Sequence, residues 1–289
     1  MKINTIMSGI QGRIRQVLYL FGTLLFLFVI TLSITHLFSH PRNDRDWTVD
    51  QQLLPTVTFN NNSVRIKNVR NFEYTDEFTY TPQYYDKTYN LDEITSVDFI
   101  VVPLAKYAVA HTFLTFGFSS GDYVSISVEV RKEKGEEYSA VKGLFDQYEL
   151  MYVIADERDV LRLRGIYRNN EVYLYPAQVS QEKMRELFVS MLQKAKALET
   201  TPEFYNTLTS SCTTNIVSHI NAISDTDVPF DIRTILPKNS DALAYELGFI
   251  NTNIPFEELR AQSEVSDKIR LYGDNINFSQ MIRSEFVEG

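Results

Sequence analysis

Hydrophobic and polar residues form different patterns in successive parts of the chain. The first part holds an uncharged run of 22 residues, from Val17 to Phe38. As a helix this run would span about 33 Å at 1.5 Å per residue, and the hydrocarbon core of a bilayer is about 30 Å thick. No Ala-x-Ala cleavage site follows it, so residues 17–38 are predicted to be an uncleaved transmembrane signal anchor.

Basic residues precede this run and set its expected orientation. Positions 1–38 hold three basic residues and no acidic one: Lys2, Arg13 and Arg15. Positive charge is retained on the cytoplasmic side, although Arg42 and Arg45 follow the run. We therefore expect residues 1–16 to be cytoplasmic, and the rest of the chain to lie outside the cytoplasm, tethered to the membrane by a single span.

Strand-like alternation dominates the second part. Residues 39–60 show no regular pattern and are expected to form an irregular juxtamembrane lead-in. Beyond them, period-two alternation and β-branched runs predict strands. The predicted strands cover residues 63–68, 97–103, 107–118, 122–131, 149–155, 160–167 and 171–176. Between two of them, Ser119–Asp122 has the composition of a hairpin turn.

Helical spacing dominates the third part. It predicts helices over residues 181–198 and 212–223, and Ser210 or Ser211 is placed to cap the second. Residues 224–289 mix loop and short helical signals whose order the pattern does not resolve. Since no Gly/Ser-rich or Pro-rich linker interrupts the region, residues 61–289 are predicted to form one extracytoplasmic α+β domain, with an antiparallel sheet packed against helices.

Composition and charge exclude several classes of protein. Hydrophobic residues make up 44% of the 289 positions and charged residues 22%, which is typical of globular domains and not of disordered or collagen-like chains. Residues 39–289 carry 25 basic and 37 acidic residues, a net charge of −12 that would repel a phosphate backbone. Nucleic acid is therefore not an expected partner, and the oligomeric state stays open.

The sequence carries no motif for a metal or a cofactor. It has no His-Glu-x-x-His, Walker or dinucleotide-binding glycine pattern, and its four histidines are scattered. Its single cysteine, Cys212, excludes an internal disulfide and a cysteine-rich zinc site. We expect neither a bound cofactor nor a metal.

Cys212 is predicted to lie in the first turn of the helix over residues 212–223. Backbone N–H groups and the helix dipole stabilise a thiolate there, which makes the cysteine a nucleophile near neutral pH. Free cysteine is also among the most frequently buried residue types, so a structural role is the alternative. The small polar neighbours, Ser-Ser before it and Thr-Thr after it, favour reactivity over core packing.

His111 lies in the middle of an apolar predicted strand. A histidine there is costly to bury unless it is hydrogen-bonded or takes part in chemistry, and a satisfied core histidine is the alternative. With Cys212 it meets the needs of a thiol nucleophile and its base. His219 follows Cys212 by seven residues, about 10 Å along the helix, and is therefore expected to be structural.

A third residue is needed to orient the imidazole, and the next strand offers Glu129 or Ser127. A three-residue hairpin loop would place His111 opposite Glu129, whereas a two-residue loop would place it opposite Val130. A carboxylate is the better partner for a histidine that becomes charged. The alternative is an exposed Glu129 paired with Arg131.

Six short motifs occur in an order that resembles the Lnb N-terminal periplasmic domain family, bacterial domains named after a lipoprotein N-acyltransferase. The motifs lie at residues 68–74, 110–116, 127–131, 204–206, 211–214 and 278–283. The resemblance covers roughly residues 45–285. Ser211 stands where the family usually has Asn before its cysteine.

The resemblance implies a circularly permuted papain-like fold of the NlpC/P60 type, in which the histidine strand precedes the cysteine helix. It implies that Cys212 is the nucleophile, His111 the base and an acyl-thioester the intermediate. The substrates would be a membrane lipid ester as donor and a lipoprotein amine as acceptor. The domain would lie in the periplasm, anchored in the cell inner membrane.

Two other function classes stay open on the sequence alone. One is a cysteine peptidase or amidase acting on cell-wall peptides, and the other is a non-catalytic envelope binding module. Acyl transfer predicts an apolar groove beside Cys212 and His111, peptidase action predicts an open polar cleft, and a binding module predicts that the two side chains do not meet.

Overall fold

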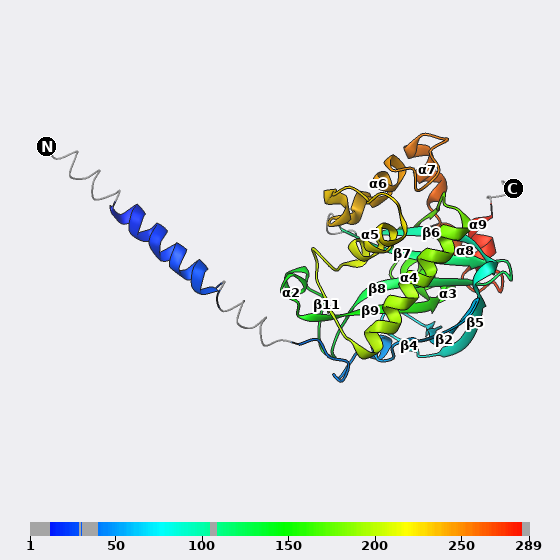
Figure 1. Cartoon of the computed structure of the whole chain (residues 1–289), viewed down its shortest axis with the longest axis horizontal. Helices are drawn as coiled ribbons and strands as arrows, with labels where there is room; N and C mark the ends of the chain where they lie inside the picture. Colours follow the sequence, from blue (N-terminus) through cyan, green and yellow to red (C-terminus); the bar gives the residue numbers. More distant parts are fainter. Residues whose placement is uncertain (1–11, 29, 31–39, 105–108, 285–289) are drawn as a thin grey trace. The chain divides into compact units, whose positions relative to one another are not determined.

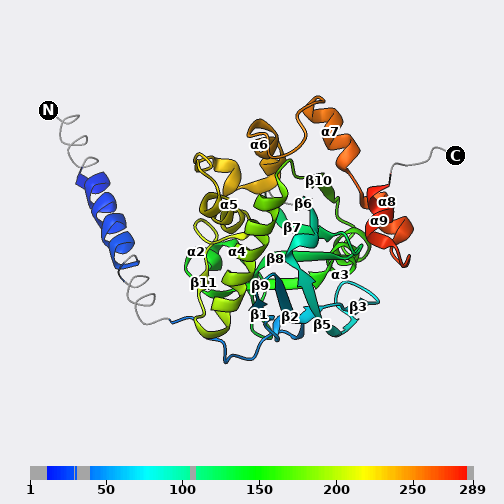
Figure 2. The ribbon, with the colours of Figure 1, turned by 45° about the vertical axis from the view of Figure 1, so that its right-hand side comes forward.

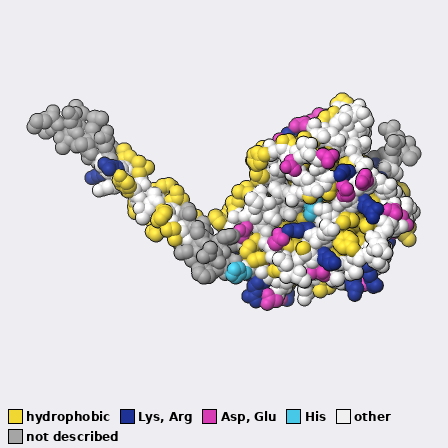
Figure 3. Space-filling model, viewed as in Figure 1, with side chains coloured by type: hydrophobic (Ala, Val, Ile, Leu, Met, Phe, Trp, Pro, Cys, Tyr) yellow, Lys and Arg dark blue, Asp and Glu magenta, His cyan; other side chains and the backbone are white. Residues whose placement is uncertain are grey.

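The computed structural model describes residues 12–28, 30, 40–104 and 109–284, and the chain forms two units, Met1–Pro41 and Arg42–Gly289. In the first unit, residues 12–28 and 30 are helical, and Figure 3 shows hydrophobic side chains along this helix. No helix within the described residues is long and apolar enough to cross a membrane. Residues 29 and 31–39, which belong to the predicted span 17–38, lie outside the described residues.

The second unit is built on a nine-stranded sheet (Figure 1). Seven strands follow the order β1-β2-β9-β8-β7-β6-β10, while β5 pairs with β2 and β11 pairs with β9; β3 and β4 form a separate pair. The strands are β1 (Thr56–Asn60), β2 (Ser63–Arg70), β3 (Glu73–Tyr74), β4 (Tyr80–Thr81), β5 (Tyr84–Asn90), β6 (Ile94–Pro103), β7 (Ala110–Phe118), β8 (Tyr123–Arg131), β9 (Tyr148–Asp156), β10 (Tyr173–Pro176) and β11 (Phe204–Tyr205).

The domain is α+β with its sheet packed against helices, as predicted, but the sheet is mixed and not antiparallel throughout. Strands β2 and β9 run parallel, with Arg70 opposite Ala155, whereas the other paired strands are antiparallel. The parallel contact arises because the hairpin β1-β2 joins the sheet beside β9, a strand far along the chain. Such a long-range pairing leaves no trace in local alternation.

Helices cover both faces of the sheet (Figure 2). Apolar side chains of α4 and α5 pack on one face around Leu114, and those of α3, α8 and α9 pack on the other around Phe113. The helices are α2 (Ala140–Leu144), α3 (Glu157–Arg162), α4 (Gln181–Thr200), α5 (Cys212–Ile223), α6 (Ser240–Glu246), α7 (Phe256–Ser263), α8 (Ser266–Tyr272) and α9 (Phe278–Arg283), with 3₁₀ turns η1 (Val49–Gln51), η2 (Leu91–Glu93), η4 (Ile232–Thr234) and η5 (Pro237–Asn239), and a π-helical turn η3 (Leu163–Tyr167).

Residues 160–167 were predicted as a strand and are helical, so this prediction was wrong. Asp156 caps α3 by accepting a hydrogen bond from the backbone of Arg158. The buried carboxylate of Asp159, one turn on, binds the guanidinium of Arg70 at 2.7 Å and the backbone N–H of Phe72 at 2.6 Å. These contacts favour the helical conformation over the strand that local alternation predicts.

The other predicted elements occur, with shifted ends. The two predicted helices are α4 and α5, and the predicted strand over 107–118 is β7, whose residues 107 and 108 lie outside the described residues. The lead-in at 39–60, expected to be irregular, ends in strand β1. Strand β5 was not predicted, because its run Tyr84–Asn90 is rich in polar residues that pair along one edge of β2.

Candidate active site

Cys212 is the first residue of α5, as the sequence predicts. Ser211 caps the helix: its side chain accepts from the backbone of Thr214, and the Thr214 hydroxyl accepts from the backbone of Ser211 at 2.7 Å. The polar neighbours of the cysteine therefore hold the helix end in place. The first N–H groups of a helix have no intrahelical acceptor, so those at the start of α5 can donate to a negatively charged group that binds there.

The side chains of Cys212 and His111 meet. Strand β7 runs under the start of α5, and the hydroxyls of Thr112 and Thr213 join the two elements at 2.8 Å. His111, the neighbour of Thr112, lies close enough to the cysteine to lower the pKa of its thiol. The side chain of His111 is only 16% exposed, so the pair is largely shielded from water.

The His111 imidazole also contacts both candidate orienting residues, Ser127 and Glu129, through its Nε2 atom. His111 Nε2 lies 2.7 Å from the Ser127 hydroxyl and 3.2 Å from Glu129 Oε1, and the Ser127 hydroxyl donates to Glu129 Oε1 at 2.7 Å. Because Nε2 is engaged there, Nδ1 is the nitrogen left for the sulfur of Cys212. The structure therefore brings Cys212, His111, Ser127 and Glu129 into one cluster.

The hairpin register explains why Glu129 meets His111. Strands β7 and β8 pair with Gly117 opposite Tyr123 and Leu114 opposite Ile126, and the turn closes with a bond from the backbone of Phe118 to that of Asp122. This register corresponds to the three-residue loop. Arg131, the alternative partner of Glu129, instead stacks on Trp47 with its guanidinium 4.3 Å from the ring centre.

Arg164 completes the cluster, and the sequence reasoning missed it. It lies in the π-helical turn η3, and its guanidinium is 3.0 Å from Glu129 Oε1 and 5.0 Å from the ring centre of Phe113. Single π turns are frequent at functional sites. The wrong strand prediction over 160–167 hid this residue, because a strand would not have carried Arg164 to the carboxylate.

These contacts shift the pKa values of the cluster toward a charged pair. Burial lowers the pKa of His111, but the Glu129 carboxylate and the hydrogen bond with Cys212 outweigh it and raise that pKa to about 9. Burial raises the pKa of Cys212, but the hydrogen bond and positive charge of His111 lower it to about 7. Burial also opposes ionisation of Glu129, yet His111 and Arg164 hold its pKa well below the usual value. A thiolate–imidazolium pair is therefore favoured between about pH 7 and 9.

His219 has the structural environment that the sequence predicts. Its two ring nitrogens lie 2.8 Å from the hydroxyls of Tyr152 and Ser190. Burial, aided by the charge of Lys194, lowers the pKa of His219 to about 4 and so keeps the ring neutral. In the described part of the chain, no three His, Cys, Asp or Glu side chains cluster closely enough to hold a metal ion.

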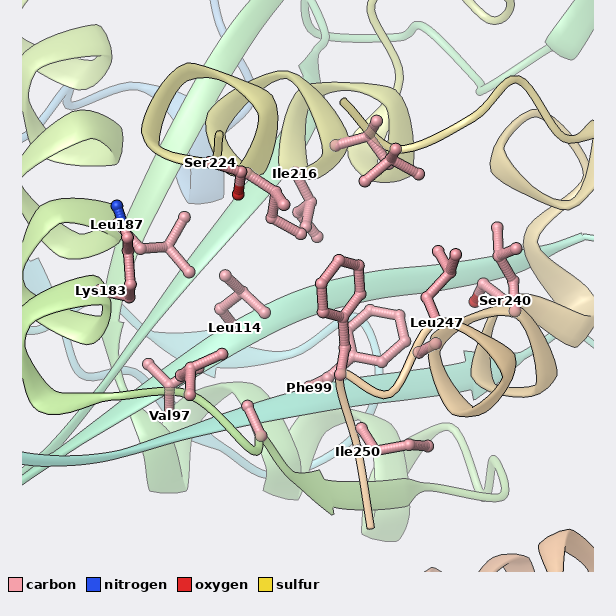
Figure 4. Close-up of a pocket in the computed structure, with 18 of the residues that line it drawn as sticks. Val97, Phe99, Leu114, Lys183, Leu187, Ile216, Ser224, Ser240, Leu247 and Ile250 are labelled. Atoms are coloured by element: carbon pink, nitrogen blue, oxygen red, sulfur yellow. The ribbon is translucent and has the colours of Figure 1, made fainter. Parts of the chain in front are cut away.

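An apolar cavity of about 260 Å³ lies between α5 and the sheet (Figure 4). Thr213, the residue after Cys212, lines it, as do Ile216 and Ile220 of the same helix. Leu114 and Phe99 of the sheet form the opposite wall. An apolar cavity of about 150 Å³ suffices to bind benzene, so this one has room for an aliphatic group.

Residues 80–238 match the family model of the Lnb N-terminal periplasmic domain. The chain belongs to this family. The matched region of this Lnb-type domain contains Cys212, His111, Glu129 and Arg164, and the family description assigns such domains to the periplasm. No curated protein and no solved structure matches the chain.

Proposed function

We propose that this protein is a membrane-anchored periplasmic thiol acyltransferase that resembles lipoprotein N-acyltransferases. Cys212 is the nucleophile, His111 its base, and Glu129 the residue that orients and charges the imidazole. The observations that carry the proposal are the Cys212–His111–Glu129 cluster and an apolar cavity whose lining begins at Thr213, the residue after Cys212.

The first half-reaction forms an acyl-thioester. The Cys212 thiolate attacks the carbonyl carbon of a membrane lipid ester, and the first N–H groups of α5 stabilise the developing oxyanion. The carbon–sulfur bond forms and the carbon–oxygen bond breaks. The leaving alkoxide takes the proton from the His111 imidazolium, so the lipid departs as an alcohol.

The second half-reaction passes the acyl group to an amine. The α-amino group at a lipoprotein's N-terminal cysteine attacks the thioester, and His111 accepts the proton that the amine loses. The carbon–nitrogen bond forms, the carbon–sulfur bond breaks, and the thiolate–imidazolium pair is restored. Neither half-reaction needs a metal or a redox partner.

A membrane anchor at residues 17–38 fits this chemistry. It would make the protein a single-pass inner-membrane protein, with residues 1–16 in the cytoplasm and residues 61–289 in the periplasm. Tethering raises the local concentration of lipid esters and lipoproteins at the domain without any new contact. The order of His111 before Cys212 along the chain also agrees with the permuted papain-like fold that we propose for residues 61–289.

The cavity favours acyl transfer over the two alternatives. A peptidase or amidase acting on cell-wall peptides needs polar groups along its cleft, whereas this cavity is walled chiefly by aliphatic and aromatic side chains of the sheet, α4, α5 and α6. A binding module has no need of a buried Cys–His–Glu cluster with shifted pKa values. The cluster and the cavity together support the enzyme.

The test is the mass of the full-length protein in detergent after incubation with diacyl phospholipid or with muropeptides. An acyl-sized mass increase on Cys212 from phospholipid, absent in His111→Gln, supports the proposal. A muropeptide adduct supports the peptidase instead. His219→Gln is the matched control, because His219 does not contact the sulfur and its substitution should leave the adduct intact.

A further inference from the structure

The cavity follows helix α5 from its first turn to its last. Residues of α5 that line it recur at helical spacing, beginning with Thr213 and ending with Ile223. Ten residues of helix at 1.5 Å each place these two positions about 15 Å apart. The α5 wall of the cavity is therefore about 15 Å long, and it begins one residue after Cys212.

The opposite wall runs in the same direction. Val101 pairs with Thr112, Phe99 with Leu114 and Val97 with Phe116, so these pairs lead away from His111 in steps along β6 and β7. Three residues of these pairs line the cavity: Phe99 and Leu114, which are nearer to His111 along the strands, and Val97, which is farther from it. Helix and sheet thus form a channel that leads away from the nucleophile.

Polar groups lie at the far end of the channel. Figure 4 shows Lys183, Leu187 and Ser224 together at one end. The Lys183 ammonium donates hydrogen bonds to Glu186 and to the backbone carbonyl of Ile223, so it ties α4 to the last turn of α5. An aliphatic chain that reaches this point meets a charged group, and burial of further methylenes ends there.

We propose that this channel is a length gauge for the acyl chain carried on Cys212, with Lys183 and Ile223 at its end. This inference rests on the proposed acyl-thioester chemistry. An extended chain advances about 1.25 Å per carbon, from bonds of about 1.5 Å at an angle of about 111°. A channel of about 15 Å therefore encloses about 12 carbons.

The occupant follows from continuity with the nucleophile. The wall begins at Thr213, one residue after Cys212, so an acyl group bonded to the sulfur would start beside the channel and could extend along its apolar wall. Each methylene that moves from water into it contributes about 0.8 kcal/mol, or about fourfold in rate. Carbons that extend beyond the Lys183 end of the channel stay in water and contribute no further burial free energy.

The test follows acylation of Cys212 by intact mass, using acyl-coenzyme A thioesters of about 4 to about 16 carbons kept below their micelle concentration. The thiolate attacks the thioester carbonyl and coenzyme A leaves as its thiol. Cys212 is the only cysteine of the chain, so the adduct has one assignment. We expect the rate to rise up to fourfold per carbon and to level off near about 12 carbons.

Two matched Ala→Phe variants locate the effect within the channel. Ala177 lies beside Val97 at the far end, since its N–H donates to the Val97 carbonyl, whereas Ala244 packs with Val101 nearer the cysteine. Ala177→Phe should slow acylation by long chains about tenfold and leave four-carbon chains unchanged. Ala244→Phe should slow medium and long chains alike, and each variant's thermal midpoint checks its folding.

The outcomes separate this inference from the function on which it rests. Acylation at equal rates for all lengths, or a rise that continues past about 16 carbons, overturns the gauge and leaves the acyl-thioester chemistry standing. No acylation by any chain overturns both. The wild-type series decides the gauge even if a variant fails to fold.

Discussion

Replacing Glu129 by Gln tests the electrostatics of the site most sharply. Glu129 is the main group that raises the pKa of His111 to about 9, against the effect of burial. A rise from an ordinary value near 6.5 corresponds to about 3 kcal/mol in favour of the charged ring. In Glu129→Gln the amide keeps its shape but carries no charge, so burial would lower the pKa of His111 instead.

The same substitution should also raise the pKa of the Cys212 thiol. The imidazolium lowers the pKa of Cys212 to about 7. Without it, burial should raise the midpoint above about 9, so that the thiolate fraction at pH 7 falls from about one half to about one hundredth. The alkylation rate with iodoacetamide at pH 7 should then fall about fiftyfold, and the midpoint of the rate against pH should move up by about two units.

The measurement has a matched control and a clear failure. Glu133→Gln makes the same change on a carboxylate that pairs with Arg45, away from His111, and should leave the alkylation profile unchanged. If Glu129→Gln still alkylates with a midpoint near pH 7, the Glu129 charge does not set the state of the pair, and this reasoning is refuted.

Three further predictions concern chemistry and stability. Cys212→Ser should abolish acylation with little change in thermal midpoint, because the hydroxyl keeps the contact with Thr213; a large loss of stability would instead indicate a structural cysteine. Arg283→Leu should lower the free energy of unfolding by about 3–5 kcal/mol, because Arg283 neutralises buried Asp98. Burial raises the pKa of Asp98, so the urea midpoint of this variant should fall as pH rises; an unchanged midpoint would contradict this. The pKa of His219 is depressed to about 4 in the folded protein, whereas an ordinary histidine in the unfolded chain has a pKa near 6.5. Between these two pH values only the unfolded chain binds the proton, so the free energy of unfolding should fall by about 1.4 kcal/mol for each unit by which the pH is lowered. His219→Gln should remove this slope, and a persistent slope would assign it to other groups.

The start of α5 could be predicted from sequence because every signal for it is local. A serine cap, a small polar flank and apolar spacing all occur within residues 210–223, and the capping box confirms them. The contact between His111 and Glu129 was one of two alternatives that the sequence allowed. It depended on whether the hairpin loop held two or three residues, and Gly121, with a φ of 87°, permits the longer loop.

The rest of the site depends on contacts between distant segments. Arg164 reaches Glu129 only because η3 is helical, and that conformation is fixed by partners such as Asp159 with Arg70, 89 residues away. The channel needs α6 and the turns before it, in the region 224–250 whose order the sequence pattern left unresolved. The parallel β2–β9 contact is also non-local, so alternation along either strand does not encode it.

The path of a labelled acyl chain tests the central claim most directly. Full-length protein in phospholipid vesicles carrying a labelled acyl chain is supplied, after a first incubation, with a lipidated peptide that has a free N-terminal cysteine amine. The account predicts that label first appears on Cys212 as a thioester and then moves to the peptide amine, and that His111→Gln blocks the first step. Label that reaches the peptide without passing through Cys212, or that never leaves the phospholipid, would contradict it.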